Sequence, residues 1–178
     1  MTLTKTPFEG LFIIEPRLFR DERGYFYESY NKRSFEAAGI QQEFVQDNQS
    51  HSRHGVLRGL HFQKPPFEQS KLVRALSGRI QDVAVDMRKD QATFGKYFSI
   101  ELSGENNKQL FIPKGFAHGF LVLSDWADVL YKCDEFYHPE SEGGARYDDD
   151  FFAVRWDLPG ATLVLAEKDL KHPPYKPS

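Results

Sequence analysis

The stretch VLRGLHFQ, residues 56–63, places a cation and an imidazole inside an apolar strand pattern. The imidazole of His61 can serve as a general base, because its unperturbed pKa of about 6.5 lies near neutral pH. The guanidinium of Arg58 is suited to bind an anion. Strict alternation puts the two side chains on opposite faces, but Gly59 between them predicts a bulge that re-aims the strand. If the strand is regular instead, Arg58 reaches a ligand only at the rim of the fold.

Further polar residues lie at strand positions expected to face inward or directly after turns: Lys71, Asp82, His118, Tyr131, Lys168 and Asp169. Each alone has a more ordinary interpretation, as a packed tyrosine, a structural histidine or a surface charge. Brought together in one barrel, a histidine, a tyrosine, a lysine and an aspartate would supply a base, an acid, an electrophile and an orienting group. Spacing alone does not establish that they converge.

Other routes to chemistry have weaker support. Six histidines invite a metal site, but HFQ lacks a second nearby ligand, and His51 and His54 lie in a stretch that resembles a hydrated loop. No phosphate-binding glycine-rich loop, Rossmann fingerprint or Gly-x-Ser-x-Gly elbow is present. Cys133 has no obvious histidine partner. We therefore expect no metal and no cofactor.

The elements that must position these residues are mostly strands. The 178 residues contain 16 Phe and 8 Tyr, which favour strands, and short apolar runs follow one another between turn residues. Runs at 10–16, 55–63, 71–78, 80–88, 96–102, 108–113, 119–124, 128–133 and 162–166 are the candidate strands. One helix is expected over 32–40, capped by Asn31 and ended by Gly39. About eight strands predict a single jelly-roll domain over 1–178, all-β with few short helices.

Composition limits the partners. The net charge of −3 argues against general binding to nucleic acid or to a membrane surface, so local Arg and Lys must meet any anion. No apolar run is long enough to span a membrane, and the N-terminal MTLTKTPFEG has no core of signal-peptide length. A single cysteine suits a reducing compartment, so we expect a cytoplasmic protein.

Seven stretches together resemble one known family in order and spacing: DERGYFYESYN, FVQDNQSHS, VLRGLHFQ, KLVRALSGRIQDVAVDMRKDQATFGKY, FIPKGFAHGF, LYKCDEFYHPESEGG and AEKD. The chain is similar to the dTDP-4-dehydrorhamnose 3,5-epimerase family from near its N-terminus to about residue 169. The resemblance implies a cupin-type jelly-roll barrel, a homodimer, and cofactor-free conversion of dTDP-4-dehydro-6-deoxy-D-glucose into dTDP-4-dehydro-L-rhamnose.

The resemblance also implies roles for individual residues. His61 matches the base, Asp169 the acid that orients it, Tyr131 the acid that returns a proton, and Lys71 the cation near the enolate. Tyr137 matches the aromatic residue that stacks on thymine. The other residues that match nucleotide-sugar contacts are Arg23, Glu28, Gln46, Asp47, Asn48, Arg58, His118, Glu142 and Lys168.

Three alternatives remain open from the sequence. A relative could epimerise only one carbon of a dTDP-sugar. A non-catalytic cupin could bind a nucleotide sugar, although such a protein has no need of an acid and a base on opposite faces. A metal-dependent cupin enzyme is the third.

Overall fold

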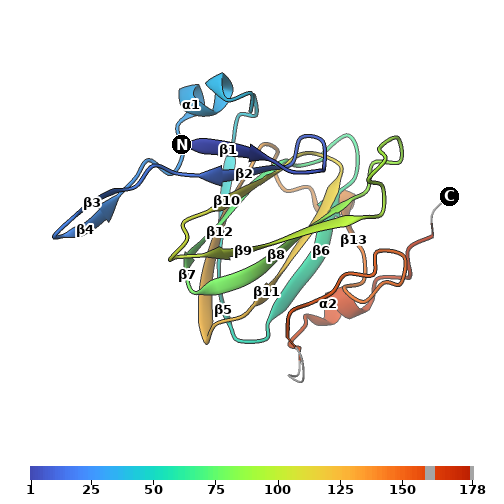
Figure 1. Ribbon diagram of the computed structural model, residues 1–178. Helices are drawn as coiled ribbons and strands as arrows, with labels where there is room; N and C mark the ends of the chain where they lie inside the picture. The colour runs from blue at the N-terminus through green and yellow to red at the C-terminus, as the bar shows by residue number, and fades with distance from the viewer. Residues whose placement is uncertain (159–162, 177–178) are drawn as a thin grey trace.

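Two antiparallel sheets lie face to face in the computed structural model, which describes residues 1–158 and 163–176 (Figure 1). The six-stranded sheet has the order β1 (Thr2–Lys5), β2 (Phe12–Glu15), β10 (Gln109–Ile112), β7 (Lys71–Ser77), β12 (Trp126–Cys133) and β5 (Gln46–Arg53). The five-stranded sheet has the order β13 (Glu142–Gly144), β6 (Leu57–Gln63), β11 (Phe116–Val122), β8 (Arg79–Asp86) and β9 (Tyr97–Ser103). This arrangement confirms the predicted all-β jelly roll.

The helices of the described residues are short, as predicted. They are α1 (Lys32–Ala37), a single 3-10 turn (Pro139–Ser141) and α2 (Glu167–Leu170). The side chain of Asn31 caps α1 by accepting from the backbone N–H groups of Arg33 and Ser34. The helix ends just before Gly39, whose φ of 95° continues the chain in a left-handed conformation. None of these helices is long and apolar enough to cross a membrane.

The main hydrophobic core lies between the two sheets. Leu110 and Val129 enter it from the six-stranded sheet, and Ile80, Leu102 and Phe120 enter it from the five-stranded sheet. These side chains are at most 3% exposed, so the core is tightly excluded from water. The two sheets are therefore held together over one end of the sandwich, while their polar inward residues gather elsewhere.

The outer faces of both sheets are covered as well. Helix α1 packs Phe35 against Leu72 and Phe111 on the six-stranded sheet. On the other side, the C-terminal segment packs Phe152 against Leu60 of β6, together with valines of β8. Figure 1 shows this segment, with α2, running along the five-stranded sheet. The covering segment is what brings Asp169 close to β6.

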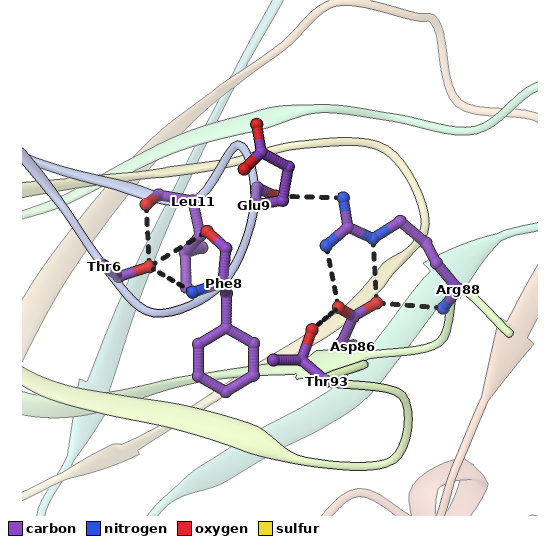
Figure 2. A network of polar contacts seen from close by, with 7 residues as sticks. All are labelled: Thr6, Phe8, Glu9, Leu11, Asp86, Arg88 and Thr93. Atoms are coloured by element: carbon purple, nitrogen blue, oxygen red, sulfur yellow. Dashed lines mark hydrogen bonds and ion pairs between the residues drawn. The ribbon is translucent and has the colours of Figure 1, made fainter. Parts of the chain in front are cut away.

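A buried ion pair ties β8 to the loop between β1 and β2 (Figure 2). Asp86 is fully buried and accepts hydrogen bonds from the Arg88 guanidinium at 2.9 and 2.8 Å and from the Thr93 hydroxyl at 2.6 Å. The same guanidinium donates to the Glu9 carbonyl at 3.0 Å. Burial opposes ionisation of Asp86, but these hydrogen bonds hold its pKa below the usual range. This carboxylate therefore has a structural role.

The bulge predicted at Gly59 is present. Arg58 pairs with Phe120 and His61 pairs with His118, so two residues of β6 stand opposite Gly119 alone. A Cβ added at Gly59 would lie 2.5 Å from the Gly119 Cα, and the φ of Gly59 is 131°. Only glycine fits both conditions. Because the bulge adds one residue, Arg58 and His61 both reach the same cavity.

Two expectations about local structure were wrong. His51 does not lie in a loop, because it belongs to β5, which pairs with β12 along its whole length. The expected strand over 162–166 falls partly outside the described residues, and its described part makes only an isolated parallel bridge between Val56 and Val164. The sequence also gave no signal for β1, which pairs with β2.

Candidate active site

A cavity of about 620 Å³ opens between the two sheets. Its wall receives His61 and His118 from the five-stranded sheet, and Asn48, Lys71 and Tyr131 from the six-stranded sheet. The volume lies within the range of about 300–1,000 Å³ that small-molecule sites commonly have. Most of the polar residues expected to face inward thus line one cavity; Asp82 does not.

His61 and Asp169 form a hydrogen-bonded pair at one wall. The Nε2 of His61 lies 2.7 Å from Oδ1 of Asp169, which is only 2% exposed, whereas the His61 side chain is 28% exposed. The segment before α2 is held beside β6 by backbone hydrogen bonds from Leu57 to Val164 and from Val164 to Gly55. This pairing brings a residue more than a hundred positions away in sequence against the imidazole.

The electrostatics of this pair favour a carboxylate. Burial raises the pKa of Asp169, but the hydrogen bond from His61, its charge and the Gly59 N–H together bring that pKa below the usual range. An ionised Asp169 accepts a hydrogen bond from the N–H at Nε2 of His61 and leaves Nδ1 as the nitrogen that can take a proton from a ligand. The pair has the geometry of an oriented general base.

Tyr131 and Lys71 stand on the opposite sheet. Their strands, β12 and β7, are neighbours, and the Lys71 ammonium lies 5.7 Å from the centre of the Tyr131 ring. Burial, followed by the nearby Cys133, raises the pKa of Tyr131, so the phenol keeps its proton at neutral pH. Burial lowers the pKa of Lys71. The Tyr131 phenol and the Lys71 amine therefore face His61 across the cavity.

Polar and charged groups line the rest of the cavity. Arg58 donates from Nε to the Ser52 hydroxyl at 3.1 Å, which holds the guanidinium at the wall. At the mouth, Glu142 accepts from Lys168 at 2.7 Å and from the Tyr137 hydroxyl at 2.8 Å. The hydrogen bond from Lys168, more than any other contact, keeps the pKa of Glu142 low. Tyr137 is 52% exposed, so its ring stands at the entrance.

Comparison with known proteins decides the family. The profile of dTDP-4-dehydrorhamnose 3,5-epimerases matches residues 5–176. The chain belongs to this family. The dTDP-4-dehydrorhamnose 3,5-epimerase of Methanothermobacter thermautotrophicus is 49% identical over 173 residues, covering 97% of this chain and 93% of the relative.

Solved structures of this epimerase family superpose closely on the chain. The crystal structure of the enzyme from Elizabethkingia anophelis NUHP1 has a TM-score of 0.94 and 52% identity, covering 98% of this chain and 96% of that one. The dTDP-6-deoxy-D-glucose-3,5-epimerase from Legionella pneumophila Philadelphia 1, in complex with dTDP-4-keto-L-rhamnose, has a TM-score of 0.92 and 49% identity, covering 96% and 90%. The cupin-type jelly roll expected from the resemblance is confirmed.

Four residues that match contacts of the epimerase family lie outside the cavity of this chain. Arg23 and Glu28 belong to an exposed arm, where they bond to Asp21 and Asn31. Asp47 forms an ion pair with Lys132 on the outer side of β5. Gln46 acts indirectly, since its side chain accepts from the Tyr137 N–H and donates to Asn48. The roles of these four in binding stay predictions.

One supporting residue was missed by sequence reasoning. Gln63 is 7% exposed; it donates to the carbonyls of Phe67 and Phe136 and accepts from the His138 N–H. These bonds hold the loop that carries Tyr137 at the mouth. The alternation of His61 with Gln63 was visible in the sequence, but nothing in it identified the distant carbonyl partners.

One group in the described residues could hold a metal ion. His61, Asp169 and His172 offer ligand atoms that all lie within 4.8 Å of one another. Two histidines and a carboxylate suit a divalent transition metal. His61 and Asp169 already form the hydrogen bond described above, so a metal bound there would compete with it.

Proposed function

We propose that this chain epimerises carbons 3 and 5 of dTDP-4-dehydro-6-deoxy-D-glucose to give dTDP-4-dehydro-L-rhamnose without a cofactor. The observation that carries the proposal is the placement of the His61–Asp169 pair and of Tyr131 on opposing sheets around one cavity. Membership in the epimerase family gives the same reaction. The roles below are argued from the geometry of these groups.

Proton removal is the first step. The hydrogens on the carbons that flank the ketone are acidic because their loss gives an enolate. Nδ1 of His61 takes such a proton, and Asp169 steadies the imidazolium that results, as in other His–Asp pairs. The Lys71 ammonium near the ketone oxygen offsets the negative charge of the enolate, and a donor in such a position is worth about 3 kcal/mol.

Inversion needs a proton delivered to the other face of the same carbon. Tyr131 is placed for this task, since β12 lies in the sheet opposite to the strand that carries His61. Its raised pKa keeps the phenol protonated until an enolate carbon accepts the proton. Exchange with solvent then removes the proton from His61 and returns one to Tyr131. The same removal and return at the second carbon complete the double inversion, and no electron transfer occurs.

Binding of the nucleotide uses the charged rim. Arg58 and Lys168 supply positive charge for the diphosphate within a chain of net charge −3. Asn48 and His118 border the same cavity and contact the sugar. The half-exposed ring of Tyr137 offers a stacking surface for thymine.

A second copy of the chain completes the site in this proposal. The β3–β4 hairpin (Phe19–Asp21 and Gly24–Phe26) projects from the body (Figure 1). Phe19 and Phe26 are 52% and 71% exposed on it, an apolar surface suited to burial against a partner. Arg23 and Glu28 contact the nucleotide of the neighbouring copy, which makes the protein a homodimer.

A cytoplasmic location is also proposed, supported by the single free thiol, Cys133.

Deuterium exchange tests the function directly. The metal-free protein is mixed with dTDP-4-dehydro-6-deoxy-D-glucose in deuterated water and followed by proton NMR. Loss of the signals from the hydrogens at both carbons, with appearance of the rhamno product, is expected. Exchange at one carbon only would establish a single-carbon epimerase, and binding without exchange would establish a non-catalytic nucleotide-sugar cupin.

A further inference from the structure

A second His–Asp pair lies behind the cavity wall. Nε2 of His118 is 2.7 Å from Oδ1 of Asp82, and both side chains are buried, at 6% and 0% exposure. His118 lines the cavity, whereas Asp82 stands behind it on β8. His118 is also the cross-strand partner of His61. The His61–Asp169 pair therefore has a second buried carboxylate, Asp82, nearby. The proposed reaction does not yet explain why a carboxylate stands there.

The second carboxylate oxygen of Asp82 adds to the free-energy cost of burying this side chain. Oδ2 is buried and has no hydrogen-bond partner in the described part of the chain. A buried carboxylate oxygen without a partner costs free energy, and such groups are uncommon in folded proteins. An apolar residue of similar size would avoid this cost. The position thus indicates a need for negative charge at this point of the interior.

Lys71 is the group that this charge affects. Burial lowers the pKa of Lys71, and Cys133, Asp82 and Glu142 oppose that shift in this order. Burial raises the pKa of Cys133 to about 11, so its thiol carries no charge at neutral pH. Glu142 is already engaged by Lys168 and Tyr137. Asp82, which is fully buried and pairs with His118, is therefore the carboxylate whose negative charge counters the effect of burial on the pKa of Lys71.

We propose that Asp82 is a positioning residue for the enolate side of the cavity. It fixes the His118 ring through Nε2, which leaves Nδ1 to face the sugar, and its charge keeps Lys71 an ammonium beside the ketone oxygen. The two His–Asp pairs then divide the work: one removes the proton, and the other holds the groups that meet the developing oxyanion. This inference rests on the proposed function of the site.

The test variant is Asp82→Asn, which keeps the shape and removes the charge. In the deuterium-exchange assay its kcat is expected to fall about 100-fold, the loss typical of a weakened oxyanion contact, while KM changes less than about twofold. The alkaline limb of kcat is expected to move to lower pH, because Lys71 without this carboxylate loses its proton more readily. Strand β10 (Gln109–Ile112) carries no titratable residue. The titratable groups that face Lys71 from other strands are Tyr131, Cys133, Asp82, Glu142 and His118.

Two further variants make the result decisive. Asp82→Glu keeps the charge and is expected to retain the wild-type alkaline limb. Asp86→Asn removes the other buried carboxylate of β8, which binds Arg88 and Thr93; it is expected to lower the melting temperature without moving that limb. If Asp82→Asn does not fold, Asp82→Leu, which needs no polar partner, is the neutral variant.

Three outcomes separate the possibilities. A neutral residue at 82 with wild-type kcat would overturn the inference. A fall in kcat with an unmoved alkaline limb would assign Asp82 a purely structural role. Absence of exchange by the wild-type protein in the same assay would instead refute the proposed function.

Discussion

At the scale of single residues, the separation of base and acid onto opposing sheets is the feature with the clearest chemical meaning. His61 is held by Asp169 at 2.7 Å, and Tyr131 stands on the sheet across the cavity. An enolate is flat, so removal of a proton from one face by the base and return of a proton to the other face by the acid inverts the carbon. This arrangement leads to different expectations for the two residues.

Replacing His61 with alanine is expected to remove turnover and to leave binding of dTDP largely intact. The proposed base is lost, which costs about 1,000-fold in kcat, whereas Arg58 and Lys168 stay at the cavity for the diphosphate of the proposed binding mode. Calorimetric titration with dTDP and the exchange assay measure the two properties separately. Loss of dTDP binding equal to the loss of turnover would show that His61 acts mainly in binding.

Tyr131→Phe is expected to separate exchange from inversion. His61 can still remove and return a proton on its own face, so exchange with deuterium should stay within about tenfold of the wild type, while product formation falls about 100-fold or more. The burial that raises the pKa of Tyr131 applies equally to a phenylalanine ring, so the fold is retained. Equal losses of exchange and product would count against Tyr131 as the returning acid.

Treatment with a chelator tests whether a metal ion at His61, Asp169 and His172 is needed for activity. We expect treatment with a chelator to change the rate by less than about twofold, because the Lys71 ammonium already supplies the positive charge that a metal would bring. Activity that disappears on chelation and returns only with a divalent metal would favour the metal-dependent cupin. In that case His172→Gln, which removes a ligand but not the base, should abolish the metal's effect.

At the scale of elements, the bulge in β6 is the device that assembles the site. It places Arg58 and His61 on one cavity although they are an odd number of residues apart. Gly59→Ala is expected to lose about 2–4 kcal/mol of unfolding free energy, because the new Cβ meets Gly119 at 2.5 Å and the φ is unfavourable. The denaturant concentration at the midpoint of unfolding and the rate of deuterium exchange into the substrate should both fall.

A matched control isolates the steric part of this prediction. Gly24 has a similar φ of 125°, yet a Cβ there would meet nothing within 4 Å. Gly24→Ala should therefore cost only about 1 kcal/mol, from its backbone conformation alone. If both variants unfold at the same denaturant concentration, contact with β11 is not what requires Gly59.

The same elements show what sequence patterns can and cannot predict. Alternating apolar runs identified most core strands, and the glycine in VLRGLHFQ predicted the bulge. Strand β5 was missed because its inward side chains, Gln46, Asn48, Ser50 and Ser52, are polar, and Asn48 and Ser50 line the cavity instead of the core. Hydrophobic periodicity cannot identify a strand whose inner face is polar.

The candidate site shows a similar division. The residue types of the site were readable from spacing and resemblance, because their chemistry is local to each motif. The pairing of Asp82 with His118 could not be predicted from the sequence, because the two residues are 36 positions apart and meet only in the folded chain. Likewise, the outward direction of Asp47 depends on its pairing with Lys132.

At the scale of the whole molecule, the projecting hairpin predicts an active site shared between two copies. Arg23 lies on this arm and does not line the cavity of its own chain, so its proposed role in binding requires a partner. Arg23→Ala and His61→Ala homodimers should each be nearly inactive. A heterodimer of the two, purified through two different affinity tags, is expected to recover about half of the wild-type activity, because one of its two sites has both residues intact.

The geometry of the mixed dimer makes this result specific. If Arg23 served its own chain, the site with an intact His61 would lack Arg23, and the other would lack His61, so no activity would return. Lys71→Ala paired with His61→Ala is the matched control, since both residues line the cavity of one chain. That heterodimer should remain inactive. Recovery in both mixtures would show that Lys71, like Arg23, acts at the cavity of the other copy, and recovery in neither would place Arg23 outside the neighbouring site.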